Sequence, residues 1–493
     1  MKALTALIST DFGNPDGLHD HNIENYFLDQ GYWNKIVESE IYFVIGRKGT
    51  GKSAIYNWIH NRQEDHNQLI SNLSFRSFPF EKLLKLSDDD YSRPNQYRSI
   101  WKYIILSELA KQIVTDEGND SFSDEYKELY KFVDSKFGKD LNQLHSKITT
   151  TSRKTDSGLK FANLGFSSTA EKAITIEDGL ENISEINIRL ENLITSYISL
   201  SQRPYLVQFD QLDDNYTLYI DNRKYFESLI SLFKVLYELN ASLRNYNKKV
   251  KVIAYLRSDI FHQFSSHDPD SAKFDFHTHY LNWAIINKDD WYNPPLLNLI
   301  NIRIENSVKE LSGNSSFYYI FNNEFINLEE NKKRADPFRY IIHRTFHRPR
   351  DIIQFCIKTQ EMAKKLNRLD FKTIKSAEKE YSSWLIDELK NEISPVIPAT
   401  DMLFTFLRTL GSKPFSREYF KRKFLQERNK SINKSPEALL RYLYELGIIQ
   451  NVKNKKFHTE RYSIVRNEKS NYDPNMKAEL HTGILKGLHN YIN

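Results

Sequence analysis

Three short apolar runs mark the first half of the chain. Their sequences are IYFVI (41–45), YLVQF (205–209) and VKVIAYL (250–256). Runs of this length are typical of strands that a parallel sheet buries on both faces. Apolar residues recur at helical spacing between them, over residues 55–59, 98–113, 178–200 and 226–237. The alternation of strand, helix and strand predicts a three-layer α/β fold with a mostly parallel sheet.

Weaker patterns fill the stretches between these elements. Residues 73–78, LSFRSF, alternate and predict a second strand after the first helix. Residues 149–158 have the composition of a loop, and residues 159–172 predict either a hairpin or an excursion from the core. Residues 81–175 are therefore expected to be a largely helical insertion or elaboration.

The pattern changes after residue 290, where the strands stop. Residues 296–308 and 352–366 predict helices, and the second is preceded by HRPRD, with a proline and an acid placed as at a helix start. Further helices are expected over 400–411, 416–429 and 435–446, followed by two strands within 445–465. This order is that of a winged helix. We therefore expect an α/β core over 1–290, a helical lid over 291–395 and a winged-helix domain over 396–493.

The turn after the first apolar run carries the strongest chemical signal. Residues 46–53, GRKGTGKS, match the spacing G-x-x-x-x-G-K-[ST] between a strand and a helix. Glycines at 46, 49 and 51 let successive N–H groups turn toward a phosphate at the start of the helix. Lys52 is expected to reach the β- and γ-phosphates, and the Ser53 hydroxyl to ligate Mg²⁺. The predicted ligand is ATP with Mg²⁺, held by Gly46, Gly49, Thr50, Gly51, Lys52, Ser53 and Ala54.

The second apolar run ends in acidic residues, FDQLDD (209–214). Phosphoryl transfer needs a carboxylate near Mg²⁺ and a group that orients the attacking water. Asp210 is the candidate for the metal, and either Asp213 or Asp214 for the water. The alternative is an ordinary capped turn, in which aspartate is common.

Two arginines are candidates for stabilising charge on the γ-phosphate. Arg257 closes the third run in YLRSD, at the carboxyl edge where sheets of this kind bind ligands. Arg350 opens a helix in RPRD, with Arg348 as its substitute. The alternatives are a surface arginine at 257 and an ion pair with neighbouring acids at 348 or 350.

Composition places the chain among folded proteins. Of its 493 residues 40% are hydrophobic and 27% charged, and Cys356 is the sole cysteine, which excludes an intrachain disulfide. No apolar run approaches the ~20 residues that a membrane helix needs. We expect a cytoplasmic location.

Positive charge gathers near the C-terminus. Residues 413–469 hold 15 Lys or Arg against 6 Glu, a net charge of +9, whereas the whole chain carries +5. The remainder is therefore slightly acidic. This distribution permits an acidic partner such as nucleic acid. We predict at most weak, sequence-independent binding through Lys421, Arg422, Lys423, Lys453, Lys455 and Lys456.

Together GRKGTGKS, FDQLDD, YLRSD, RPRD and the C-terminal winged helix resemble bacterial AAA+/STAND-type P-loop ATPases, in particular a group found among anti-phage defence genes. FDQLDD is similar to the NACHT-type pattern F-D-G-L-D-E, with Gln211 in place of glycine and Asp214 in place of glutamate. The resemblance implies a nucleotide-driven switch that forms homo-oligomers or acts on a separate effector protein. It also implies that residues 11–27 help hold the adenine.

Two further functions remain open. One is an AAA+ protein that acts on DNA through its winged helix, similar to origin-recognition ATPases. The other is a P-loop kinase, which is less favoured because the sequence shows no acceptor site.

Overall fold

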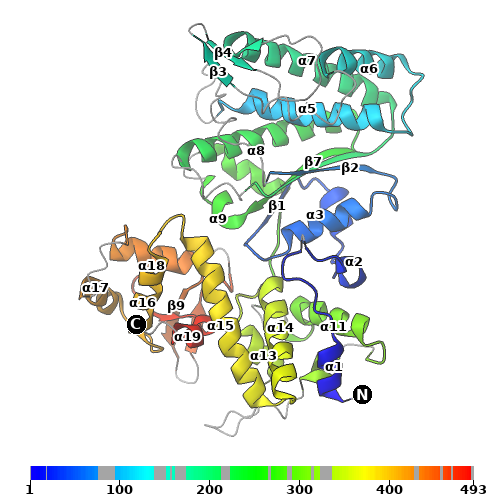
Figure 1. The fold of residues 1–493 in the computed structure, drawn as a ribbon. Coiled ribbons are helices and arrows are strands. Elements are labelled where there is room, and N and C mark those ends of the chain that lie inside the picture. Colours follow the sequence, from blue (N-terminus) through cyan, green and yellow to red (C-terminus); the bar gives the residue numbers. More distant parts are fainter. Residues whose placement is uncertain are drawn as a thin grey trace. The chain divides into compact units, whose positions relative to one another are not determined.

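The computed structural model describes residues 2–17, 19–75, 95–137, 152–155, 158–161, 174–212, 222–264, 268–285, 291–311, 316–321, 336–426, 432–455, 459–467 and 470–489 (Figure 1). Contacts divide the chain into two compact units. The helical unit comprises Met1–Asp29, Lys48–Gly51 and Asn282–Asn493, and the α/β unit comprises Gln30–Arg47 and Lys52–Leu281. Each unit has its own hydrophobic core. The predicted division into three domains stays a prediction.

The α/β unit is built on a parallel sheet whose order, within the described residues, is β2-β6-β7-β1-β8. Every residue of β6 is buried, as expected for a strand covered on both faces. Gly46 pairs with Arg257, and Ser74 pairs with Asp210, so the strands end together at one edge. The bounds are β1 (Phe43–Gly46), β2 (Leu69–Ser74), β6 (Tyr205–Asp210), β7 (Val250–Arg257) and β8 (Thr278–Tyr280).

Helices cover both faces of this sheet. Figure 1 shows α3 (Lys52–Asn61) on one face, and α5 (Arg98–Thr115) with α8 (Asn222–Arg244) on the other. The Trp101 indole joins the last two by donating to the Ser228 carbonyl at 2.9 Å. The predicted three-layer α/β core is therefore confirmed. Further elements of the unit are η1 (Trp33–Val37), α6 (Asp124–Phe137), α7 (Ile176–Leu200), α9 (Ser258–Phe261), η4 (Pro269–His277), and the small antiparallel sheet of β3 (Ser152–Thr155), β4 (Gly158–Phe161) and β5 (Ile174–Thr175).

Two local predictions in this unit need correction, and one strand was not predicted at all. The strand expected at 73–78 begins earlier, at Leu69, and residues 76–78 lie outside the described part. Polar Ser71 and Asn72 hide β2 in the sequence, because an edge strand needs apolar residues less than a central one does. The short polar strand β8 was missed for the same reason. Residues 152–155, expected as loop, pair with β4.

Helices dominate the helical unit, with α14 (Pro349–Leu366) and α15 (Phe371–Ile393) packed side by side (Figure 1). Pro349 stands in the first turn of α14, as predicted, and Asn367 ends that helix in the left-handed region with a φ of 48°. The Asp370 side chain caps α15 by accepting from the Thr373 N–H. The other helices here are α1 (Ala3–Ser9), α2 (Ile23–Tyr26), α11 (Pro295–Ser307), α12 (Ser316–Ile320) and α13 (Pro337–Ile342).

The C-terminal part contains the predicted helices and hairpin. They are α16 (Thr400–Leu410), α17 (Arg417–Gln426), α18 (Pro436–Glu445), β9 (Ile449–Asn454) and β10 (Thr459–Tyr462). The sequence did not predict β11 (Lys477–Leu480), which pairs with β9, or α19 (Thr482–Leu488).

Helix α19 lies against α15 at very short range. The Gly487 N–H donates to the Ser382 hydroxyl at 2.8 Å. A Cβ at Gly487 would come within 2.7 Å of both the Ile386 side chain and the Ser382 carbonyl oxygen. Glycine is therefore required there for close packing.

Candidate functional site

The glycine-rich loop joins the end of β1 at Gly46 to the start of α3 at Lys52. Gly49 and Gly51 have φ angles of 82° and 96°, a region that other residues rarely adopt. The Lys52 ammonium donates to the carbonyl oxygens of Gly46 at 2.9 Å and Arg47 at 3.3 Å, and the residue is only 9% exposed. The backbone and the lysine thus have the arrangement that a phosphate-binding loop requires.

Three residues of the helical unit donate hydrogen bonds to carbonyl oxygens of this loop. The Lys48 carbonyl accepts from the Arg348 guanidinium at 3.0 Å, and the Gly49 carbonyl from the Arg350 N–H at 3.3 Å. The Thr50 carbonyl accepts from the Trp283 indole N–H at 2.9 Å. A carbonyl oxygen repels a phosphate, so bonds that engage these oxygens favour anion binding by the loop. Trp283 was not predicted as part of the site.

Three other residues of the loop and helix start were predicted to bind the nucleotide or its metal. Thr50 is buried, and Ser53 and Ala54 are half-buried in the first turn of α3. The positive end of that helix dipole lies at the loop, which adds to its attraction for anions.

Asp210 ends β6 and is 2% exposed. Burial first, and the Asp210 charge second, raise the pKa of the Tyr56 hydroxyl on α3. The same two causes raise the pKa of Tyr255 on β7. The Asp210 carboxylate therefore lies in a setting of low dielectric constant, where it acts on neighbouring groups and would strongly attract a cation. A carboxylate and the Ser53 hydroxyl are hard oxygen ligands of the kind that Mg²⁺ prefers, so these residues fit that ion.

Gln211, which follows Asp210, stands where the pattern F-D-G-L-D-E has glycine. Gln211 has a φ of 60°, in the left-handed region that favours glycine. Its side chain hydrogen-bonds with the Ser74 hydroxyl at the end of β2. The glycine of the pattern F-D-G-L-D-E would adopt this conformation without strain, whereas Gln211 bears a cost of about 1 kcal/mol. Asp213 and Asp214 lie outside the described residues, so their roles stay predictions.

Arg257 lies opposite Gly46 in the register of β7 and β1. Its guanidinium donates to both carboxylate oxygens of Asp259, at 3.0 and 2.7 Å. Burial would raise the pKa of Asp259, but the charges of Arg257 and Lys52 outweigh it and lower that pKa. Asp259 therefore belongs to the electrostatic environment of the phosphate loop. The sequence offered it in YLRSD, yet only Arg257 was predicted.

Arg348 and Arg350 differ in how they are held. Arg348 is buried and forms a bidentate pair with Asp351, and its Nη1 lies 3.5 Å from Glu392 Oε1. Burial would lower the pKa of Arg348, but these carboxylates raise it. The ion-pair alternative is therefore present at Arg348, which is engaged as a structural residue. An ion pair is present at Arg350 as well, because its Nη1 lies 3.3 Å from Glu388 Oε2, although this side chain is partly exposed.

Part of the segment predicted to hold adenine lies close to Arg350. The Pro15 carbonyl accepts from Arg350 Nε at 3.2 Å, and Asp16 Oδ1 lies 4.0 Å from Nη2. The buried Arg303 guanidinium anchors the same segment by donating to the Phe12 carbonyl at 3.1 Å. Contact with a base stays a prediction.

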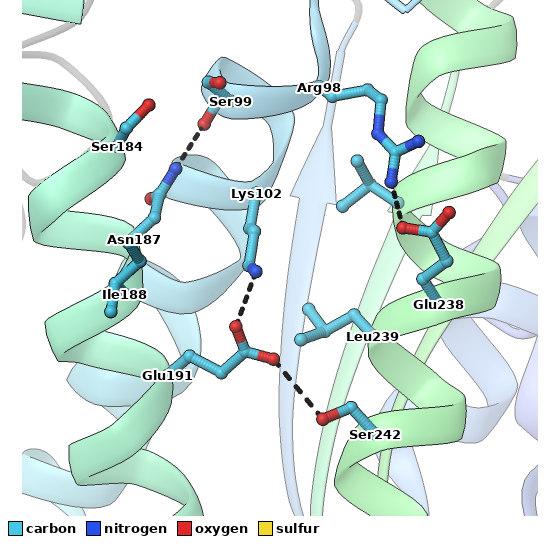
Figure 2. A pocket seen from close by; sticks show the side chains of 11 residues that line it. Arg98, Ser99, Lys102, Ser184, Asn187, Ile188, Glu191, Glu238, Leu239 and Ser242 are labelled. Atoms are coloured by element: carbon cyan, nitrogen blue, oxygen red, sulfur yellow. Dashed lines mark hydrogen bonds and ion pairs between the residues drawn. The ribbon is translucent and has the colours of Figure 1, made fainter. Parts of the chain in front are cut away.

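The α/β unit also contains a cleft that the loop residues do not line. The cleft has a volume of about 510 Å³ and lies between α5, α7 and α8. Figure 2 shows the side chains that line it. Its charges pair with each other, Arg98 with Glu238 and Lys102 with Glu191 at 2.5 Å. Because these charges cancel, the cleft does not offer the excess positive charge that a triphosphate needs. The phosphate loop is the better candidate for a nucleotide site.

A parallel α/β sheet with this loop between β1 and α3 defines the class of P-loop NTPases. The family described as FunZ-associated C-terminal helical domain matches residues 294–390, from α11 into α15. The chain is 23% identical over 418 residues to the "Putative transposon gamma-delta 80.3 kDa protein" of Escherichia coli K12. This match covers 82% of the chain and 54% of that protein, so the chain spans about half the length of this curated relative.

Two solved structures are similar at low sequence identity. One is the ORC1 protein of Aeropyrum pernix in complex with DNA, with 11% identity, a TM-score of 0.36, and coverage of 96% of this chain and 91% of that one. The other is the ORC2 protein of Aeropyrum pernix in ADPNP–ADP complexes, with 12% identity, a TM-score of 0.31, and coverage of 98% and 97%.

No helix within the described ranges is long and apolar enough to cross a membrane.

Proposed function

We propose that this chain binds Mg·ATP at the phosphate loop and hydrolyses it slowly, as a molecular switch. The observation that carries the proposal is the loop itself. Gly49 and Gly51 adopt positive φ angles, and Lys52 lies buried against the loop carbonyls at the start of α3. A positive-φ glycine loop followed by a lysine at a helix start is the arrangement that binds phosphate groups in proteins, which supports the proposal.

The proposed roles follow from position. Lys52 binds the β- and γ-phosphates, and Ser53 with Asp210 would hold Mg²⁺, which would supply positive charge to neutralise the phosphates. Asp213 or Asp214 orients the attacking water. Arg257, opposite Gly46 in register, and Arg350, bonded to the Gly49 carbonyl, are the candidate cations for the γ-phosphate.

Replacing Lys52 tests the nucleotide site most directly. We expect Lys52→Ala to abolish ATP binding or hydrolysis, because it removes the cation on the phosphates. The matched control is Lys131→Ala, at an exposed lysine on α6 that should leave both unchanged. Turnover of the Lys52 variant at the wild-type rate would refute an ATPase at this loop.

Replacing the three aspartates one at a time distinguishes metal binding from activation of the attacking water. We expect Asp210→Asn to weaken Mg·ATP binding. Asp213→Asn or Asp214→Asn should instead keep the affinity and slow hydrolysis at least tenfold, which corresponds to about 1.4 kcal/mol of transition-state stabilisation. Normal rates in both of these variants would place the water-orienting group elsewhere.

The proposed output of the switch is a conformational change that acts on a separate effector or on further copies of the chain, in a defence role of the kind that the resemblance implies. The short-range contact of Gly487 on α19 with α15 supports a lid and C-terminal part that move together. Co-purification at native expression, with and without ATP, would identify the partner. Recovery of nucleic acid alone would favour the alternative below.

The second candidate is an ATPase that acts on DNA through the C-terminal part, which we propose to be a winged helix. Its support is the net charge of +9 over 413–469 and the word transposon in the name of the curated relative. Several of its cations have acidic partners, such as Lys421 with Glu437 and Lys455 with Glu460 at 3.7 Å. Helix α18 uses Leu439, Leu440 and Leu443 for the core.

These features favour weak contacts with phosphates over sequence readout. Replacing Lys453, Lys455 and Lys456 by Ser should remove DNA retention and flatten its salt dependence by up to about three units of slope, with ATP hydrolysis intact. Lys456 lies outside the described residues. Tight binding to one duplex sequence at physiological salt would make the DNA-acting function the better proposal.

A further inference from the structure

One carboxylate on α15 is shared by two cations that belong to the phosphate loop and its neighbourhood. Glu388 Oε2 lies 3.3 Å from the Lys48 ammonium and 3.3 Å from Nη1 of Arg350. Burial would raise the pKa of Glu388, but Lys48 and Arg350 outweigh it and hold that pKa below its ordinary value. The group is therefore ionised at neutral pH and holds both cations.

Arg350 cannot move far from the loop, because its backbone is tied to it. The Arg350 N–H donates to the Gly49 carbonyl, and a Cβ at Gly49 would lie 3.1 Å from the Arg350 Cβ. Nε of the guanidinium donates to the Pro15 carbonyl at 3.2 Å, whereas Nη1, which faces Glu388, can exchange its partner by side-chain rotation. Lys48 lies in the loop, and rotation of its side chain can likewise exchange Glu388 for another partner of the ammonium.

We propose that Glu388 is a positioning residue that competes with the terminal phosphate of ATP for Lys48 and Arg350. It would thereby set how strongly the site distinguishes ATP from ADP. This inference rests on the proposed nucleotide function and adds a residue that neither the motif nor the predicted catalytic set contains.

The chemistry of the exchange is favourable. Carboxylate and phosphate oxygens accept from the same ammonium and guanidinium donors. The side chain of Glu388 is 22% exposed and those of Lys48 and Arg350 are 30% and 21% exposed, so water can solvate each group as the partners change. Partly exposed pairs of this kind contribute little net free energy, and a γ-phosphate with greater negative charge can displace the carboxylate. ADP lacks that group and leaves the bridge in place.

The test measures dissociation constants for ADP and for adenylyl imidodiphosphate, a non-hydrolysable ATP analogue, both with Mg²⁺ and by calorimetry. We expect Glu388→Gln to raise the preference for the triphosphate about fivefold, chiefly through tighter triphosphate binding. The matched control is Glu380→Gln, an exposed glutamate on the same helix, which should leave the preference unchanged.

A second comparison removes the cations. In the Lys48→Gln/Arg350→Gln background, Glu388→Gln should no longer change the preference, because its partners are gone. A merely structural Glu388 would instead weaken both ligands equally in either background.

The outcomes distinguish this inference from the proposed function. Wild-type protein that binds neither nucleotide would overturn both. Wild-type protein that binds both ligands, with a preference that Glu388→Gln leaves unchanged or lowers, would overturn the inference and leave the nucleotide site standing.

Discussion

Helix α15 presents two glutamates that each hold two cations, but in different surroundings. The Glu378 side chain is 4% exposed, accepts from the Tyr340 hydroxyl at 2.5 Å, and pairs with Arg344 at 2.8 Å and Lys486 at 2.5 Å. Glu388 is 22% exposed and holds Lys48 and Arg350 at 3.3 Å each.

Burial gives the two groups different functions. A buried charge that loses a partner is left unsolvated, so the Glu378 cluster cannot exchange partners and joins α13, α15 and α19 permanently. A partly exposed charge such as that of Glu388 loses little when its partner changes, because water can replace the partner. The same chemistry thus makes a fixed joint at one end of α15 and an exchangeable contact at the other.

The largest effect should come from the buried glutamate. We expect Glu378→Gln to lower the free energy of unfolding by about 3 kcal/mol, because it leaves Arg344 and Lys486 without a counter-charge. Urea denaturation at pH 7 measures the change, with the exposed Glu380→Gln as the control near zero. A loss below about 0.5 kcal/mol would show that the cluster is not a fixed joint.

The next effect tests the close packing beside that cluster. Alanine in place of Gly487 would ordinarily favour a helix, yet its Cβ would meet Ile386 and the Ser382 carbonyl. We expect Gly487→Ala to cost about 2 kcal/mol of unfolding free energy. The control is Lys379→Ala on the exposed face of α15, which should change stability little. A stabilised Gly487 variant would mean that α19 can move away from α15 at low cost.

The partly exposed Glu388 should matter far less for stability than Glu378. We expect Glu388→Gln to change the free energy of unfolding by less than about 1 kcal/mol at pH 7, measured in the same urea experiment. A loss as large as that of Glu378→Gln would erase the distinction between the two groups.

The smallest effect is the pH dependence of the contribution that Glu388 makes to stability. The folded pKa of Glu388 is lowered, so its stabilising contribution is present above the ordinary glutamate pKa of about 4.3 and is lost as the pH falls through the folded value. The difference between wild type and Glu388→Gln should therefore shrink on acidification from pH 7 to pH 3. A difference that grows on acidification would contradict the sign of this shift.

The sequence predicted the parts of the fold that local pattern determines. Strands β1, β6 and β7 are mostly apolar and almost entirely buried, and the phosphate loop is specified by consecutive residues. The edge strands β2 and β8 carry polar residues such as Asn72 and His279, so only pairing with a central strand reveals them. The helix starts at Pro349 and Pro436 were visible because proline has a positional preference.

The candidate site was predictable only where its residues are adjacent in sequence. Trp283 and Glu388 are far along the chain from the loop residues that they contact, and neither belongs to a motif that would indicate this contact. Arg257 was visible at the end of a strand, but its partner Asp259 needed the geometry of the first turn of α9. The positive φ of Gln211 could not be predicted from the sequence either, because glutamine rarely adopts this conformation.

The indole of Trp283 gives the loop an intrinsic optical reporter. Indole fluorescence responds to the hydrogen bond of its N–H and to nearby charge, and this indole bonds the Thr50 carbonyl directly while being 7% exposed. The chain has 6 tryptophans, so the emission of Trp283 is obtained by subtracting the spectrum of Trp283→Phe from that of the wild type. A ligand that reshapes the loop would thus be seen in unlabelled protein, on the timescale of mixing, before any product is released.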